Sequence, residues 1–203
     1  MTSDTLKFYN DNASELCQRY ESAEVNHLWE KIVATFHSGS KILEIGCGSG
    51  RDASHMYENG LDIIAIDGSL ELLNQTIKTH ADLSGRVCQT ILPSFLPFAD
   101  AVFDGIISIA CLMHFSEEHI RQILSEFCRV TKSNAQFIIS IPAGRADVSD
   151  GTDDKGRIFI LLTIEEWEKL FLDFNIKIID LQIQSDGLGR KGVEWASFML
   201  KMT

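Results

Sequence analysis

A glycine-rich pentapeptide and one aspartate are the residues of this sequence best suited to chemistry. The run Gly46–Gly50 reads GCGSG and follows the apolar segment KILEI. Small residues let the backbone approach a ligand closely, and the N–H groups of such a loop can meet an anionic group. Asp67 follows the next apolar segment, DIIAI, where a carboxylate can accept hydrogen bonds from both hydroxyls of a ribose. This spacing predicts a site for a nucleotide-type cofactor.

The register of the glycines distinguishes between the kinds of nucleotide loop. A dinucleotide loop has the pattern G-x-G-x-x-G/A, and Arg51 stands where its third small residue belongs. A side chain of that size would crowd the approach of the helix to a pyrophosphate. A P-loop is excluded because no Gly-Lys-Ser/Thr follows. Asp67 alone does not separate NAD from S-adenosylmethionine, since both contain that ribose.

Short apolar runs separated by helical patterns must position these residues. Five runs have the character of buried parallel strands: residues 41–45, 62–66, 87–91, 103–109 and 135–141. The segment up to about Phe36 has a helical apolar period, with one face made by Val25, Leu28, Trp29, Ile32, Val33 and Phe36. Ser69 and Ser116 suit helix N-caps, and Thr163 forms a capping box with Glu166.

Two more strand-like runs, IKIIDLQIQ and VEWASFMLK, are joined only by SDGLGRKG. So short a connection makes a hairpin of antiparallel neighbours. The expected fold is α/β: a doubly wound, mostly parallel seven-stranded sheet with an antiparallel C-terminal hairpin strand and helices on both faces. The length fits a single domain, 1–203.

The composition excludes several classes of protein. The formal net charge of −11 argues against a nucleic-acid binder and against an anionic membrane surface. The sequence has no apolar run long enough for a membrane span and no signal peptide at its start. Its five cysteines show no pairing pattern, so we expect reduced thiols and a cytoplasmic location. The histidines lack metal-site spacing, and we expect no metal.

Four segments together resemble one family. They are the opening FYNDNASELCQRYES, then ILEIGCGSGRDA, AIDGS, and LPFADAVFDGIISIACLMHF. They are similar to the class I, Rossmann-like S-adenosylmethionine-dependent methyltransferases, and most closely to the small type 11 and type 25 enzymes. The resemblance covers nearly the whole chain. It implies S-adenosylmethionine as cofactor, S-adenosylhomocysteine as product, and an N-terminal helical lid at 1–38 over a core at 39–203.

The resemblance also implies cofactor-binding residues at the ends of three strands. They are Glu44, Gly46, Cys47, Gly48, Gly50, Asp67, Gly68, Ser69, Ala110 and Cys111. In the family, the glycine loop lies under the methionyl part, Asp67 would hold the ribose, and Gly68 and Ser69 would flank the adenine. Many relatives have an acid before LPF that meets the adenine amine. Here the stretch TILPSF has none.

Three residues are candidates for catalysis: His114, Tyr9 and Tyr20. His114 follows the fourth strand, at the edge of the sheet where open α/β folds bind ligands. It would act as a base or substrate contact, or it only supports the helix that starts at Ser116. In relatives the N-terminal segment folds over the cofactor, so the tyrosines would be lid residues, or they only pack a loose arm. Methyl transfer needs a base only if the acceptor arrives protonated.

Two connections at the same edge bring basic residues toward an acceptor: Arg145 and Arg157 from residues 142–157, and Arg190 and Lys191 from SDGLGRKG. Such a rim would recognise a carboxylate or phosphate. The alternative is simple pairing with nearby aspartates. We expect Trp195 to lie in the core rather than to form a substrate platform, and Cys47 to be a small loop filler rather than a reactive thiol. Arg51 either covers the outside of its helix or contacts the cofactor or the lid.

The function predicted from these patterns is S-adenosylmethionine-dependent methyl transfer to a small molecule, by a monomer or homodimer. No part of the chain is left over for gripping a macromolecule. Two alternatives stay open: a protein or peptide acceptor, and a catalytically silent S-adenosylmethionine-binding module.

Overall fold

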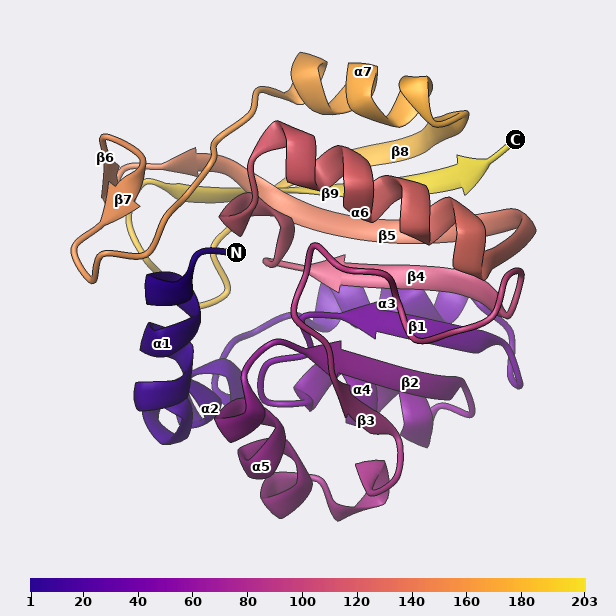
Figure 1. The fold of residues 1–203 in the computed structure, drawn as a ribbon, viewed down its shortest axis with the longest axis horizontal. Helices are drawn as coiled ribbons and strands as arrows, with labels where there is room; N and C mark the ends of the chain where they lie inside the picture. The colour runs from indigo at the N-terminus through magenta and orange to yellow at the C-terminus, as the bar shows by residue number, and fades with distance from the viewer.

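One seven-stranded sheet forms the centre of the molecule (Figure 1). The computed structural model describes all residues, Met1–Thr203. The strand order is β3-β2-β1-β4-β5-β9-β8. The strands are β1 (Lys41–Ile45), β2 (Asp62–Asp67), β3 (Val87–Gln89), β4 (Phe103–Ile109), β5 (Thr131–Arg145), β8 (Ile176–Ser185) and β9 (Val193–Met202). The first five are parallel, and β9 is antiparallel to both of its neighbours, which confirms the predicted fold class.

Helices cover both faces of the sheet because its strands are apolar on both sides. The helices are α1 (Ser3–Asp11), α2 (Ala13–Glu21), α3 (Asn26–Thr35), α4 (Arg51–Glu58), α5 (Leu70–Thr79), α6 (Glu117–Val130) and α7 (Ile164–Asp173). Within β1, Ile42 packs with residues of α3, α4 and α5, whereas Leu43 packs with residues of α6 and α7. Two buried cores therefore lie back to back across the sheet.

The predicted helix starts are all present. Ser69 Oγ accepts a hydrogen bond from the Leu72 backbone N–H, and Ser116 plays the same part for α6. Thr163 and Glu166 form the predicted capping box of α7. Each cap fixes where a helix leaves the carboxyl edge of the sheet.

The N-terminal segment is helical as predicted, but it divides into two parts. α1 and α2 rest on α5 through a small cluster of Ala13, Leu16 and Leu72, and they stand beside the carboxyl edge of the sheet (Figure 1). α3 instead joins the core under the sheet. The apolar face predicted for it is only partly right, because Val33 is 40% exposed.

Three details differ from the sequence-based expectations. β3 is shorter than the apolar run 87–91. β5 does not end at residue 141: it continues to Arg145 because β9 is long enough to pair with that extension. The connection that follows contains a small hairpin, β6 (Val148–Ser149) with β7 (Thr152–Asp153), rather than an irregular loop.

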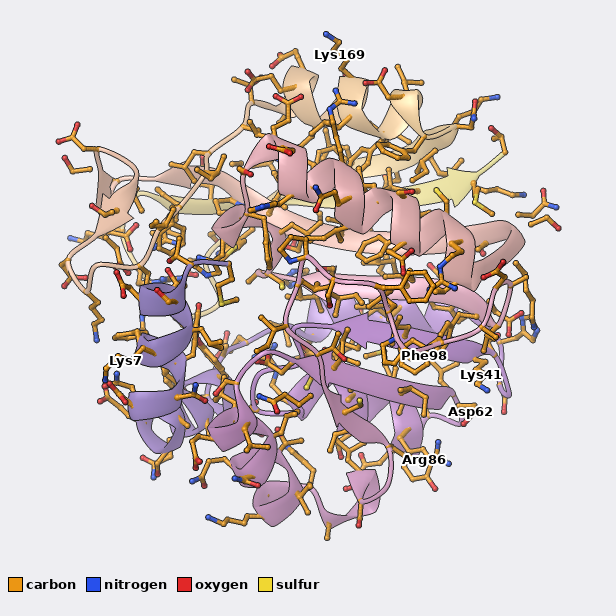
Figure 2. The ribbon with its side chains drawn as sticks, in the orientation of Figure 1. Lys7, Lys41, Asp62, Arg86, Phe98 and Lys169 are labelled. Carbon is orange, nitrogen blue, oxygen red and sulfur yellow. The ribbon has the colours of Figure 1, made fainter.

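The amino ends and the carboxyl ends of the parallel strands lie on opposite sides of the molecule. Lys41 and Asp62 begin β1 and β2 on one side, and Lys7 of α1 lies on the other (Figure 2). The glycine loop and Asp67 are at the edge near α1. None of the helices combines the length and apolar character that crossing a membrane requires. No three His, Cys, Asp or Glu side chains are grouped so as to hold a metal ion.

Candidate functional site

A cavity of about 210 Å³ lies at the carboxyl edge of the sheet. The ends of β1, β2 and β4 form its floor, and residues of α1 and α2 line the opposite side. Residues from the β5 and β9 ends and from the β8–β9 turn complete the wall. Segments far apart in the sequence therefore meet around one space.

The glycine loop fits tightly under this cavity. Gly46 has φ +73°, and a Cβ atom there would lie 2.6 Å from Cys111 Sγ. Gly48 has φ +57° and faces the Tyr20 ring, which a Cβ atom would approach to 3.3 Å. Both positions therefore need glycine for conformation and for space. Burial raises the pKa of Cys111 to about 12, so this thiol stays protonated.

Asp67 shapes the loop as well as facing the cavity. Its Oδ2 accepts a hydrogen bond from the Gly48 N–H at 3.0 Å, and its Oδ1 accepts one from the Ser69 N–H at 2.8 Å. Burial raises the pKa of this carboxyl, and the backbone hydrogen bonds act against that rise. A carboxylate oxygen has more than one lone pair, so Asp67 keeps acceptor capacity for hydroxyls in the cavity.

Glu44 is the buried carboxyl of the site. Its side chain lines the cavity, it is 2% exposed, and its Oε2 atom has no hydrogen-bond partner. Burial and then the nearby Asp52 raise the pKa of Glu44 well above its ordinary value. A cation next to Oε2 would supply the missing partner and stabilise the charged form.

These residues fit the cofactor implied by the sequence. A methionyl ammonium suits Glu44, the ribose hydroxyls suit Asp67, and the glycine backbone leaves room for a chain against the loop. Along the adenine side the lining residues are Thr90, Ile91 and Leu92, with no acid among them. The apolar side chains there are suited to contacting an aromatic base.

Eight of the ten predicted cofactor residues line the cavity: Glu44, Gly46, Cys47, Gly48, Asp67, Gly68, Ala110 and Cys111. Gly50 and Ser69 do not. Gly50 faces Thr76 and Leu83 behind the loop, where its φ of +82° serves the turn into α4. Ser69 is fully buried, and its hydroxyl caps α5 and donates to Asn10 Oδ1.

The three catalytic candidates also line the cavity, and two of them touch. Tyr9 Oη lies 2.8 Å from His114 Nε2, and His114 Nδ1 lies 2.6 Å from the Ile158 carbonyl oxygen. Since a carbonyl only accepts, Nδ1 carries the proton and Nε2 accepts from Tyr9. Burial lowers the pKa of His114 to about 4, so the ring is neutral at physiological pH.

Arg51 ties the N-terminal helices to the glycine loop. Its Nη1 donates to the Tyr20 carbonyl oxygen at 2.6 Å, and its Nε and Nη2 hold Asp52. Asp52 also accepts from Trp29 Nε1 at 2.7 Å. Arg51 lines the cavity. Of the two expectations for Arg51, the structure therefore shows the contact with the lid and not an outward-facing position, because α2 folds back over it.

The basic residues were expected either to recognise an anionic group or to pair with nearby aspartates, and each expectation describes part of the structure. Arg145, Arg157 and Arg190 line the cavity, whereas the exposed Lys191 does not. Each arginine also pairs with an aspartate, and these partners are Asp147, Asp153 and Asp186.

Two aromatic site residues are not evident from the sequence. Trp195 lines the cavity and donates from Nε1 to Asp186 at 2.9 Å, so the expectation of a core position is wrong. Phe159 is buried against His114, with ring centroids 4.8 Å apart. Its place follows from the β6–β7 hairpin, for which the sequence has no periodic signal.

Comparison with known proteins supports the cofactor half of this site. Residues 43–139 match a family model described as a methyltransferase domain. A demethylmenaquinone methyltransferase from Renibacterium salmoninarum is 28% identical over 102 residues, which are 50% of this chain and 41% of that protein. The chain thus spans about two fifths of the length of the curated relatives it matches.

Solved structures share the fold. One is the Burkholderia thailandensis 1,6-didemethyltoxoflavin-N1-methyltransferase with bound 1,6-didemethyltoxoflavin and S-adenosylhomocysteine, with a TM-score of 0.77 at 18% identity over 99% of this chain and 88% of that one. Another is the [4+2]-cyclase SpnF, with a TM-score of 0.65 at 18% identity over 87% of this chain and 80% of that one. Residues 43–139 therefore resemble a methyltransferase domain, and the chain as a whole shares the fold of these solved structures.

Proposed function

We propose that this protein transfers a methyl group from S-adenosylmethionine to a small-molecule acceptor. One observation carries the proposal: Glu44 and Asp67 end adjacent strands and face one cavity, and Glu44 Oε2 is buried without a partner. An amino-acid ammonium and a ribose on one ligand match this pair of acids. The cofactor, when bound, supplies a methyl group already activated on a sulfonium.

The residues of the chain then have to orient the acceptor and exclude water. Orientation of two reactants contributes roughly 7–11 kcal/mol in favourable cases. Tyr9 and His114 line the same cavity as Cys111, and in this proposal neutral His114 Nε2 takes a proton that the acceptor gives up through Tyr9. His114 is in the tautomer that can act as a base through Nε2, because Nδ1 carries the proton and donates it to the Ile158 carbonyl oxygen in a hydrogen bond.

The size of the cavity, about 210 Å³, favours a small acceptor over a protein. α1 and α2 line one side of it through Tyr9 and Tyr20. The demethylmenaquinone and toxoflavin names of related proteins support the same class. A cytoplasmic location and a monomeric or homodimeric state remain predictions from the sequence.

Calorimetry with S-adenosylhomocysteine tests the cofactor half. We expect binding, and a loss of at least about tenfold in affinity for Asp67→Ala, since a charged hydrogen-bond acceptor is removed. Asp62→Ala is the matched control, because Asp62 begins the same strand at the opposite edge and pairs with Arg86. Absence of binding, or equal affinity in the two variants, contradicts the proposal.

Transfer of label from methyl-labelled S-adenosylmethionine to a panel of small acceptors tests the second half. Product formation that falls in His114→Asn supports the assignment of His114. Cofactor binding without transfer to any small molecule, peptide or protein would instead indicate a silent binding module.

A further inference from the structure

Two buried arginines form one wall of the cavity. The Arg145 side chain is 1% exposed and the Arg157 side chain is 9% exposed, and both line the space next to His114. Arginine is rarely buried to this degree unless its charge is paired. The partners of these two charges therefore indicate what the wall can bind.

The counter-ions lie behind the wall. Arg145 donates from Nε and Nη2 to Asp147 at 2.6 and 2.8 Å, and Arg157 donates from Nε to Asp153 at 2.8 Å. Neither aspartate lines the cavity, although both arginines do. Each carboxylate thus binds the side of its guanidinium that faces away from the cavity.

The remaining nitrogens are poorly satisfied by the protein. Arg145 Nη1 has no hydrogen-bond partner in the chain, and Arg157 Nη1 reaches only Tyr9 Oη, at 3.4 Å. A guanidinium has five N–H donors, and planar oxyanions accept from them in pairs. The unfilled donors are therefore suited to an oxyanion in the cavity.

Phe159 fixes the spacing of this wall. The Cζ of Arg145 is 4.1 Å from the centroid of the Phe159 ring, and the Cζ of Arg157 is 5.3 Å from it. Asp153 Oδ1 also accepts from the backbone N–H groups of Lys155 and Arg157, which holds the turn. Both cations are thus positioned before any ligand arrives, which lowers the entropy lost on binding.

The carboxylates of the cavity are distributed unevenly. Glu44, Asp52 and Asp67 lie at the cofactor end, and Glu24 lines the cavity beside the β8–β9 turn. Asp186 is neutralised by Arg190 and hydrogen-bonded by Trp195. Arg145 and Arg157 donate to no carboxylate that lines the cavity, so their remaining N–H groups favour an anion there.

We propose that the methyl acceptor carries an oxyanion, a carboxylate or a phosphate, held by Arg145 and Arg157. This rests on the proposed methyltransferase function, because the acceptor must share the cavity with the cofactor. The oxyanion lies against the arginine wall, and the methylated atom points toward Tyr9, His114 and Cys111. The two arginines select the acceptor and take no part in methyl transfer.

Calorimetry on the protein saturated with S-adenosylhomocysteine tests this inference with three probes of similar shape. Benzoate carries a carboxylate, phenyl phosphate carries a phosphate, and benzamide is neutral. We expect at least one anion to bind about tenfold or more tightly than benzamide, because charged hydrogen bonds are stronger than neutral ones. The tighter anion identifies the group. Equal binding of all three overturns the inference, and absent S-adenosylhomocysteine binding overturns the proposed function instead.

Variants test whether Arg145 and Arg157 cause the preference for anions. Arg145→Met and Arg157→Met should each remove most of the preference for anions, whereas Arg121→Met, on the exposed face of α6, should keep it. The double variants Arg145→Met/Asp147→Asn and Arg157→Met/Asp153→Asn also remove the carboxylate that has lost its partner, which in the case of Asp153 is buried, and they serve if the single variants unfold. If these variants lose S-adenosylhomocysteine affinity by the same factor as anion affinity, the arginines hold the cofactor, and the inference is wrong.

Discussion

His114 shows how one side chain is kept in a defined protonation state. Its Nδ1–H is engaged by a carbonyl group, its Nε2 accepts from a phenol, and its ring is buried near Arg157 and Arg145. Burial is the main reason that its pKa falls to about 4, because a charged imidazolium would lose its hydration there. At pH values well above 4 the ring is therefore neutral, with its proton on Nδ1 and Nε2 unprotonated.

This pKa predicts a pH dependence of stability. In the unfolded chain His114 binds a proton near pH 6.5, and in the folded protein it does so only near pH 4. The unfolded state therefore binds more protons in this window, and stability falls as the pH drops through it. Between pH 6.5 and 4.5 the loss from this residue is about 2 kcal/mol.

Urea unfolding at several pH values measures this effect. His114→Asn should lose about 2 kcal/mol less than the wild type between pH 6.5 and 4.5, whatever its stability at pH 7. His119→Asn, in the adjoining helix and outside the cavity, should keep the wild-type slope. Identical slopes in all three proteins would mean that His114 is not held neutral.

Between elements, a backbone hydrogen bond at the cavity joins the α2–α3 connection to the β8–β9 turn. The Glu24 N–H donates to the Gly187 carbonyl oxygen at 3.0 Å. A Cβ atom on Gly187 would lie 2.5 Å from the Glu24 carbonyl oxygen. A hairpin near the C-terminus thus holds the N-terminal helices against the cavity.

Gly187→Ala should loosen this closure. The new Cβ has a position fixed by its own backbone and meets backbone atoms of Glu24, so the two segments must move apart. We expect about a fivefold loss in S-adenosylhomocysteine affinity, or about 1 kcal/mol. Hydrogen exchange of residues 20–26 should become faster. Gly189→Ala is the control in the same turn: its φ of +69° adds strain, but nothing lies within 4 Å of the new Cβ. Faster exchange in both variants would mean that strain in the turn, not this contact, controls the closure.

Elements defined by local chemistry were predictable from the sequence, and those defined by distant partners were not. Apolar runs revealed β1, β2 and β4, and side-chain caps revealed the starts of α5, α6 and α7. The extension of β5 to Arg145 depends on pairing with β9, which begins nearly fifty residues later in the chain. Local periodicity contains no information about that pairing.

At the scale of the whole molecule, α1 and α2 are peripheral to folding but central to the cavity. The two large cores on the faces of the sheet contain no fully buried residue before Leu28. α1 and α2 contribute only to the small third cluster against α5. Stability and ligand binding therefore depend on different parts of the chain.

Deletion of residues 1–24 should separate the two properties. We expect a cooperative thermal transition at a lower Tm, together with a loss of more than about tenfold in S-adenosylhomocysteine affinity, because one wall of the cavity is gone. Circular dichroism measures the thermal transition, and calorimetry measures the affinity for S-adenosylhomocysteine. Lys7→Ala, on the exposed side of α1, should change neither. A deletion variant without a cooperative transition would show that these helices belong to the folding core.

The cofactor half of the site was predictable because its residues lie within short, contiguous motifs. The part of the cavity proposed to bind the acceptor was only partly predictable from the sequence. His114, Tyr9 and the arginines could be named as candidates, but Phe159 and Trp195 meet them only after β6, β7 and β9 have formed. Likewise, the sequence predicted Ser69 both as a helix cap and as a cofactor residue, and it does not show that the hydroxyl is fully engaged by Leu72 and Asn10.

The division of the cavity between two stretches of chain has a consequence for how such a protein can change. The segment that matches the family model, 43–139, includes the glycine loop, Asp67 and His114 and ends before Arg145. Arg145 and Arg157 come instead from the end of β5 and from the connection that follows it. Under the proposed function, replacing this connection changes the choice of acceptor and leaves the glycine loop and Asp67 as they are, so it is the place where evolution or protein design can introduce a new specificity.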